Sequence, residues 1–428
     1  MIKNYPPEIR KALRIITLTQ CTGQLTNILF GNGFMLAYFM RQGVPDYRIL
    51  FLFAMMPLIA MLLTVPFSLI ADYAGKRFVG AAGIIISSAG IFLLFFTPFF
   101  PSAAESGLAA GTVIFSLGAT ATGSSWFALL SPIVPAEIRG RWFGFMRMTF
   151  QFTGVIFSLA VAALLRRFTS LSFFQTVLFF CGGMMIFRIF LYRQIPELEP
   201  CTRLKFNFPA ALRDVVRIPG YMSFCAYMFL LAFCTGAVPN LLGLLQREFL
   251  GFTDSMLVVL GNLLIAGTIA GFFVGGKLVD RIGPRPVFLT AHIVFSATIA
   301  LILFRGFFPL PTAGTIGLAA FFFGAMQGAT GIAGTSELLA LIPPENKSFT
   351  TGMNITLSSA GLALSGVLSG QLLQNHMLHT HWQFYGQPMS AYDTILAVLM
   401  FLVALMAVTL GLVPAVRHLR AQWLPQNR

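Results

Sequence analysis

The chain has 428 residues, of which 57% are hydrophobic and 10% are charged, whereas soluble domains carry roughly 25% charged residues. With a mean hydropathy of +0.82, this much apolar surface could not be hidden in one water-soluble core. The composition therefore excludes a soluble enzyme and indicates a protein embedded in a lipid bilayer.

Twelve apolar stretches follow one another along the chain, and a helix that crosses a bilayer core needs about 20 apolar residues. They lack the short alternating segments of a membrane β-barrel, so we expect helices that satisfy their own backbone hydrogen bonds. The stretches are 14–40, 47–72, 77–97, 107–134, 142–165, 171–193, 219–247, 254–278, 286–304, 312–341, 349–373 and 391–416.

The net charge of +14 could suggest a nucleic-acid partner, but the positions of the basic residues argue against one. With twelve spans and the N-terminus inside, 22 of the 28 Lys and Arg residues fall on the inner side, as the positive-inside rule requires. We therefore expect no nucleic-acid partner and both termini in the cytoplasm. The compact loops favour a bacterial inner membrane. The basic residues left outside are Arg41, Arg48, Arg166, Arg167, Arg247 and Arg305.

The sequence repeats itself at one ungapped offset of 208 residues (254 − 46), which relates loops at three separate places. Six spans return the chain to its starting side, so the repeats are parallel, as in many carriers that hold a substrate near the midplane. We predict a six-helix bundle over 1–193, a cytoplasmic linker with a short interfacial helix over 194–218, and a second bundle over 219–428. The matched pairs include Gly43 and Gly251, Asp46 and Asp254, Asp72 and Asp280, Gly75 and Gly283, Arg77 and Arg285, and Glu137 and Glu345.

Two short loops carry a family resemblance. The segment from Gly276 to Arg285, with Asp280-Arg281 and Gly283, resembles the signature loop of the major facilitator superfamily. Its partner from Ser68 to Arg77 is a degenerate copy, and Arg139-Gly140-Arg141 resembles the Arg-Gly-Arg loop of that family. The resemblance implies an all-α polytopic membrane protein with twelve transmembrane helices in two parallel six-helix repeats. It identifies the scaffold and not the solute.

The resemblance also implies a conformational role for these loops, in which the aspartates latch the inner ends of the two halves. Asp72 would then face the start of the eleventh span and Asp280 the start of the fifth. The alternative is that both only orient neighbouring Lys and Arg side chains. The candidate gating residues are Asp72, Gly75, Arg77, Glu137, Arg139, Arg141, Asp280, Arg281, Gly283, Arg285 and Glu345.

Polar side chains inside a span are costly and by default face the bundle interior or a cavity. The first span carries a polar stripe at helical spacing, formed by Thr17, Gln20, Gln24, Asn27 and Gly31. Hydrogen bonds between helices are the alternative for each amide, and Trp126 can equally pack against its neighbours. The candidate substrate-binding residues are Gln24, Asn27, Asn32, Trp126, Gln151, Asn240 and Gln327.

Charged residues avoid the middle of every predicted span, which favours a neutral polar or amphipathic solute. Glu337 and Arg147 enter spans near the inner side, and we expect them at an inner gate. Glu337 is the first candidate for a coupling proton, with His292 second. The alternative is that each charge reaches back to the interface.

We therefore expect a secondary or facilitative carrier that works by alternating access as a monomer, in contact with lipid. A coupling proton is left open, and no catalytic activity, cofactor or resident metal is expected. Two alternatives remain. One is an exporter of hydrophobic or toxic compounds, although Phe152-Thr153-Gly154 lacks the glycine-proline motif of that group. The other is a transporter-like sensor without flux.

Overall fold

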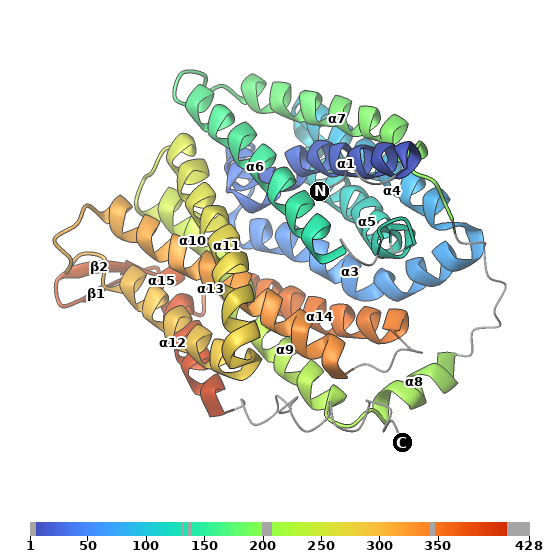
Figure 1. Ribbon diagram of the computed structural model, residues 1–428. Helices are drawn as coiled ribbons and strands as arrows, with labels where there is room; N and C mark the ends of the chain where they lie inside the picture. Colours follow the sequence, from blue (N-terminus) through green and yellow to red (C-terminus); the bar gives the residue numbers. More distant parts are fainter. Residues whose placement is uncertain (1–5, 131, 136–138, 199–207, 342–346, 409–428) are drawn as a thin grey trace. The chain divides into compact units, whose positions relative to one another are not determined.

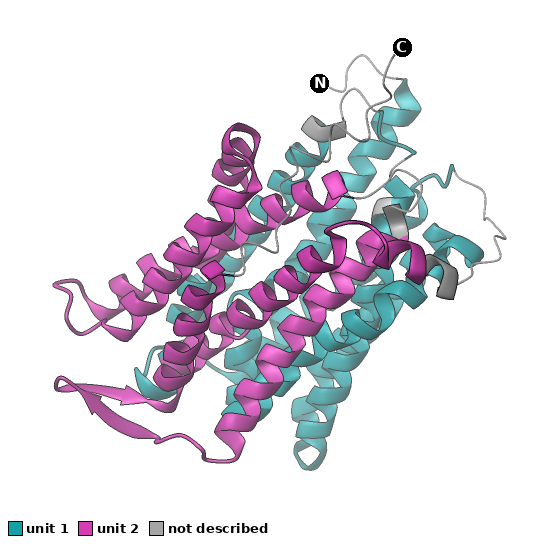
Figure 2. Ribbon diagram, turned by 90° about the horizontal axis from the view of Figure 1, so that it is seen from below, with its two compact units in different colours: residues 1–204, 246–262 teal, residues 205–245, 263–428 magenta. Residues whose placement is uncertain are grey.

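The computed structural model describes residues 6–130, 132–135, 139–198, 208–341 and 347–408. These residues form two compact units (Figure 2). Unit 1 comprises 1–204 together with 246–262, and unit 2 comprises 205–245 together with 263–428. The segment 246–262 thus packs with the N-terminal helices, although it lies in the second predicted bundle.

Unit 1 consists of long helices joined by short connections (Figure 1). They are α1 (Pro7–Gly31), α2 (Phe34–Arg41), α3 (Asp46–Ala74), α4 (Lys76–Phe96), the turns η1 (Thr97–Phe99) and η2 (Pro101–Ala103), α5 (Ala104–Leu130), α6 (Arg139–Leu165) and α7 (Leu171–Arg193). The π-helical turn η4 (Leu245–Phe249) and the first turns of α11 (Asp254–Ile282) complete this unit.

Unit 2 contains the rest of α11 and the following elements of the second half. They are α8 (Phe208–Val216), α9 (Tyr221–Gly236), α10 (Val238–Leu244), α12 (Pro284–Leu303), α13 (Thr312–Leu341), α14 (Lys347–Gln374), β1 (His381–Phe384), β2 (Gln387–Ser390) and α15 (Ala391–Leu405). The short helix predicted in the linker corresponds to α8.

Eleven helical segments of the described chain are long and apolar enough to cross a membrane. The first predicted stretch, 14–40, is not among them: α1 is long enough, but its polar residues lower its hydropathy, and the helix breaks before α2. Gly33 has φ +85°, which glycine adopts at little cost, and the side chain of Asn32 accepts a hydrogen bond from the Phe34 amide at 3.0 Å. The chain is an all-α polytopic membrane protein, and this broken helix accounts for the twelfth predicted span.

The internal repeat extends to the helix boundaries. The helices α3 and α11 each have 29 residues and begin 208 residues apart (254 − 46). The same offset separates the starts of α4 and α12 (284 − 76) and those of α6 and α14 (347 − 139). Gly75 and Gly283 both have positive φ, +105° and +84°, where one helix ends and the next begins. The repeated glycines therefore keep the same backbone conformation in both copies.

The helices pack closely where side chains are small. A Cβ atom added at Gly271 of α11 would lie 1.9 Å from the carbonyl oxygen of Ala325 in α13. Gly267 and Gly275, four residues to either side, also lie against α13, at Phe321 and Ala329. These three small residues therefore serve close helix packing.

A β-hairpin precedes the last helix, and the sequence analysis did not predict it. The strands β1 and β2 pair antiparallel, with His381 opposite Ser390. The two turn residues Tyr385 and Gly386 both have positive φ, +46° and +79°, which is the backbone of the turn that matches the twist of a two-residue hairpin.

Candidate functional site

The polar stripe of α1 forms the accessible face of this helix in unit 1. Asn27 is exposed, and Gln20 and Gln24 are half-buried. Gln24 donates a hydrogen bond from Nε2 to Oε1 of Gln151 in α6 at 2.7 Å. Two predicted binding residues are thus brought together, while the amide of Asn27 is left accessible beside them.

Asn32 takes part in a buried chain of hydrogen bonds within unit 1. Its Nδ2 donates to Oγ of Ser158 in α6 at 2.5 Å, and that hydroxyl donates to Oδ1 of Asn262 in α11 at 2.6 Å. Asn32 and Ser158 are fully buried, and Asn262 is almost so. The side chain of Asn32 is therefore engaged in linking α1, α6 and α11.

A charged cluster lies at the first turn of α11. Arg41, at the end of α2, donates from Nε and Nη2 to Oδ2 of Asp254 at 2.9 and 2.7 Å. Arg247 approaches Oδ1 of the same carboxylate at 3.3 Å. The Asp254 side chain is only 2% exposed, so this is a largely buried carboxylate held by two guanidinium groups. The sequence analysis noted Asp254 only as a repeated residue.

Arg188 of α7 is a second finding that the sequence analysis missed. By its place in the sequence Arg188 belongs to an inner segment, but it is 7% exposed and its side chain reaches α1. A Cβ atom added at Gly23 would lie 2.5 Å from Cζ of Arg188, so the guanidinium rests against the backbone of α1. Gly23 lies four residues before Asn27, near the middle of the first predicted span. The backbone positions of charged residues thus avoid the span centres, but the long side chain of Arg188 carries its guanidinium towards one.

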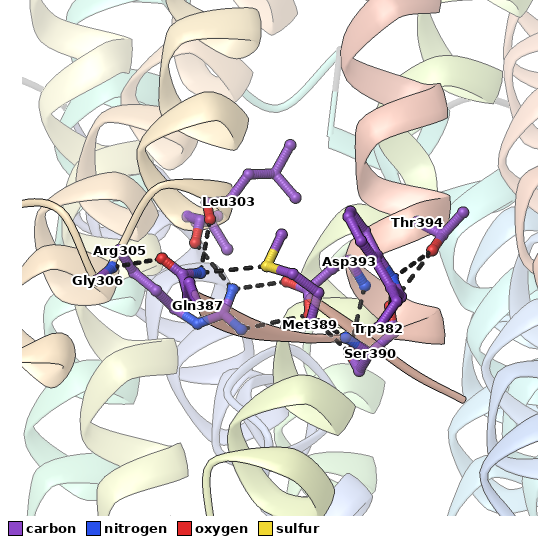
Figure 3. Close-up of polar contacts among 10 residues, drawn as sticks. Leu303, Arg305, Gly306, Trp382, Gln387, Met389, Ser390, Asp393 and Thr394 are labelled. Carbon is purple, nitrogen blue, oxygen red and sulfur yellow. Dashed lines mark hydrogen bonds and ion pairs between the residues drawn. The ribbon is translucent and has the colours of Figure 1, made fainter. Parts of the chain in front are cut away.

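In unit 2, a buried ion pair connects α12 and α15 (Figure 3). Arg305 contacts Oδ1 of Asp393 at 2.6 Å and Oδ2 at 3.3 Å. Ser390 donates to the same carboxylate from its amide and its hydroxyl, at 2.8 and 2.7 Å. Gln387 of the hairpin bonds the Leu303 carbonyl and the Gly306 amide, both at 2.9 Å. Every group in this network has a partner, so its arrangement indicates a structural role.

The remaining candidate binding residues occupy different environments. Trp126 is 5% exposed and packs in the hydrophobic cluster of unit 1, with its ring 5.9 Å from that of Tyr192. This environment corresponds to the alternative in which Trp126 packs against neighbouring helices. Asn240 in α10 and Gln327 in α13 are half-buried in unit 2.

The candidate gating loops are described in part. Asp72 is half-buried, while Arg77, Asp280, Arg281 and Arg285 are exposed. Glu197, which the sequence analysis did not single out, accepts hydrogen bonds from the amides of Lys76 and Arg77 at 2.6 and 3.4 Å. A carboxylate at the first turn of α4 matches the positive end of that helix. Arg139 and Arg141 lie in the first turn of α6, and Glu137 and Glu345 lie outside the described residues.

Glu337 is the single carboxyl group of α13. Its side chain is fully buried, and neither oxygen has a hydrogen-bond partner within the described part of unit 2. Arg285 acts on it electrostatically. His292, the second candidate for a coupling proton, is also buried and lies 3.0 Å from the Tyr227 hydroxyl through Nε2. Arg147 is exposed on α6.

No group of three or more His, Cys, Asp or Glu residues that could hold a metal occurs in the ranges that the structure describes. The polar groups of this chain are instead amides, hydroxyls and a few buried charges on membrane-spanning helices. These helices are long and apolar enough to cross a membrane, and the arrangement is consistent with a membrane transporter.

Comparison with known proteins agrees with this class. The family model of the Major Facilitator Superfamily matches residues 21–366, so the chain belongs to this superfamily. It is therefore a transporter and not an enzyme. The comparison with curated proteins found no match.

Several solved transporter structures share the fold. The xylose transporter XylE from E. coli, in an inward-open conformation, has a TM-score of 0.71 at 12% identity and covers 97% of this chain and 100% of its own. The nucleoside transporter NupG has a TM-score of 0.67 at 12% identity, with coverage of 95% and 98%. A bacterial homologue of the iron transporter ferroportin, in an inward-facing state, has 0.65 at 15% identity, with 94% and 98%. At these identities the likeness shows the fold alone.

Proposed function

We propose that this chain is a secondary carrier that moves a small polar or amphipathic solute across the membrane by alternating access. The observation that carries the proposal is the polar face of α1, where Asn27 is exposed beside the Gln24–Gln151 pair. An exposed amide on a membrane-spanning helix is costly in lipid. It is well placed in an aqueous cavity, where it can bind the uncharged polar groups of a solute.

The two six-helix halves, 1–193 and 219–428, would be the moving parts of this carrier, connected by the cytoplasmic linker 194–218. In the proposed orientation, which follows the positive-inside rule, Asp254 is on the external side and the signature loops are inside. The Arg41–Asp254 contact would then hold the external end closed. The loops at Asp72 and Asp280 would latch the inner end in the opposite state.

Glu337 is the proposed proton site for coupling. A buried carboxyl group without a hydrogen-bond partner is unfavourable as an anion, so it can exchange a proton when a conformational change exposes it. The carrier is further proposed to act as a monomer in a bacterial inner membrane, with lipid around it and both termini in the cytoplasm.

The test is a two-step measurement on the purified full chain. A thermal-shift screen of sugars, nucleosides, amino acids, organic acids and lipophilic compounds first identifies solutes that bind. Flux of each hit is then followed in proteoliposomes, with Asn27→Ala as the variant and the exposed Gln194→Ala as a control at the end of the bundle. Saturable uptake that Asn27→Ala weakens supports the proposal. Binding without flux would instead favour a sensor.

A further inference from the structure

Arg188 is a buried cation without an anionic partner. No carboxylate of the described chain lies within ion-pair distance of its guanidinium. Its contacts are 3.5 Å from Nη2 to Oε1 of Gln20 and 4.0 Å from Nη1 to Sδ of Met185, and both are long. Nε has no partner at all. Burying a charged group without a partner costs several kcal/mol in proteins, so the arrangement requires an explanation.

The donors of Arg188 that lack a good acceptor lie on one edge of the guanidinium. Nε and Nη2 point in parallel from that edge, and this pair matches the two oxygens of a carboxylate in a bidentate contact. Among the described residues, the acceptor within hydrogen-bond distance of this edge is Oε1 of Gln20 at 3.5 Å. Because Gln20 is half-buried on the accessible face of α1, a carboxylate that arrives along this face can take its place.

The same chain shows what a satisfied buried arginine looks like. Arg305, which is 4% exposed, has two contacts to Asp393 and donates to the Ile302 carbonyl. Arg188 is buried to nearly the same extent, but its carboxylate is not supplied by the chain. The two sites thus differ in that Arg305 has a carboxylate partner from the chain and Arg188 does not.

Arg188 lies beside a hydrophobic cluster of unit 1 that supplies no carboxylate, and Tyr192 of this cluster interacts with it electrostatically. Met185, which it contacts, belongs to a hydrophobic cluster that also contains Trp126 and Trp142. The indole Nε1 atoms of both tryptophans are buried and lack a hydrogen-bond partner. Gly23 has no side chain, and the guanidinium occupies the place where one would lie. The described residues of unit 1 thus place no carboxylate at the guanidinium.

We infer that Arg188 binds a carboxylate group of the transported solute, with Nε and Nη2 as its donors. The inference rests on the proposed function, because the solute reaches Arg188 along the polar face of α1. It names the solute as a small organic acid, whose uncharged groups meet the amides of Gln24 and Asn27. The neutral solute expected from the sequence is thereby revised.

The experiment uses the purified full chain and a panel of sodium salts at constant ionic strength: acetate, lactate, succinate, chloride and phosphate. Binding is followed by tryptophan fluorescence, because Trp126 lies in the cluster beside the site, and by the shift in apparent Tm. The variants are Arg188→Gln and Arg188→Lys. Arg193→Gln removes the same charge from the exposed end of the same helix and serves as the matched control.

A carboxylate is expected to bind wild type and Arg193→Gln alike. Arg188→Gln should raise its Kd by about tenfold or more, because hydrogen bonds to charged groups contribute about 1.5–3 kcal/mol, and Arg188→Lys should fall between. Without any anion, Arg188→Gln should keep or raise the apparent Tm, since it removes a buried charge that lacks a partner. A structural arginine would instead lose stability on this substitution.

Three results would overturn the inference: no carboxylate response in wild type, an unchanged response in Arg188→Gln, or a marked fall in the apparent Tm of Arg188→Gln without anion. A response to chloride or phosphate alone would place an inorganic anion at Arg188 and also reject the carboxylate. Equal flux of an uncharged solute in wild type and Arg188→Gln would leave the carrier function standing while this inference fails. Arg188-dependent acetate binding without any flux would do the reverse.

Discussion

Arg41 and Asp254 are 213 residues apart in sequence, and two nitrogen atoms of the arginine bond one carboxylate oxygen of the aspartate. With Arg247 on the other oxygen, Asp254 holds the end of α2 beside the start of α11. The contact therefore joins α2 of the first sequence repeat to α11 of the second, and its loss should weaken the attachment of α11 to α2.

The first prediction concerns this contact. Asp254→Asn leaves two guanidinium groups without their anion, so the proposed external end should open about tenfold more often or beyond, since hydrogen bonds to charged groups contribute about 1.5–3 kcal/mol. The measurement is the labelling rate of Ala162→Cys by a membrane-impermeant maleimide, in a chain without other cysteines. Ala162 is 1% exposed and its carbonyl accepts a hydrogen bond from Ser255, so it becomes reactive only when α11 leaves α6.

The matched control for that experiment is Arg48→Gln. Arg48 pairs with Glu105, but their side chains are 43% and 50% exposed, and such surface pairs contribute only about 0–1 kcal/mol. Labelling should not change in this variant. Equal labelling of wild type and Asp254→Asn would show that the carboxylate does not keep this end closed.

The second prediction concerns the Gln24–Gln151 hydrogen bond. Because the two amides act as a unit, Gln24→Ala and Gln151→Ala should each raise the KM for solute by about threefold, which corresponds to the roughly 0.6 kcal/mol typical of such bonds in membranes. The double variant should raise it no further. Gln175→Ala, which removes an amide bonded to the Phe95 carbonyl instead, should leave KM unchanged. Additive effects of the two substitutions would mean that the amides act independently.

The third prediction concerns proton coupling at Glu337. In Glu337→Gln the amide has a similar shape but cannot release a proton, so solute uptake should lose its dependence on a pH gradient. Exchange of labelled for unlabelled solute at equal pH on both sides should persist. The exposed Glu8→Gln should behave as wild type. Gradient-driven uptake that survives in Glu337→Gln would place coupling elsewhere, with His292 the next residue to replace.

The fourth prediction concerns stability. Asp393→Asn should lower the stability of the folded chain by about 3–5 kcal/mol, because it leaves the buried Arg305 without its charge partner. The fall in apparent Tm should be far smaller in the double variant Arg305→Met with Asp393→Leu, which replaces both charges with apolar groups. A double variant less stable than either single one would contradict this account.

Much of the architecture was predictable because its signals are local. Apolar runs of sufficient length define most helices, and positive φ at Gly75 and Gly283 explains why the repeated loops keep glycine. The break after α1 was missed because Asn32 and Gly33 lie inside one apolar run. The positive φ of Gly33 and the Asn32 side-chain bond to Phe34 together end the helix there. The hairpin was missed because Tyr385 adopts a left-handed backbone that its residue type does not suggest.

The candidate site was less predictable, because its contacts join residues far apart in sequence. Periodicity placed Gln24 and Asn27 on one face of α1, but it could not show that Gln151 meets Gln24. The position of Arg188 near the end of α7 gave no sign that its long side chain extends to Gly23. A count of charged residues by backbone position therefore misses the guanidinium that lies beside Gly23.

The closeness of Gly261 to the break after α1 has a consequence for leakage. A Cβ atom at this glycine would lie 2.3 Å from the carbonyl oxygen of Asn32, so α11 meets the broken helix backbone to backbone. A contact this close leaves no room for a hydrogen-bonded chain of water molecules, which could otherwise conduct protons. The contact of these two stretches of main chain therefore excludes water at this point, and protons have no water-filled route between Gly261 and Asn32.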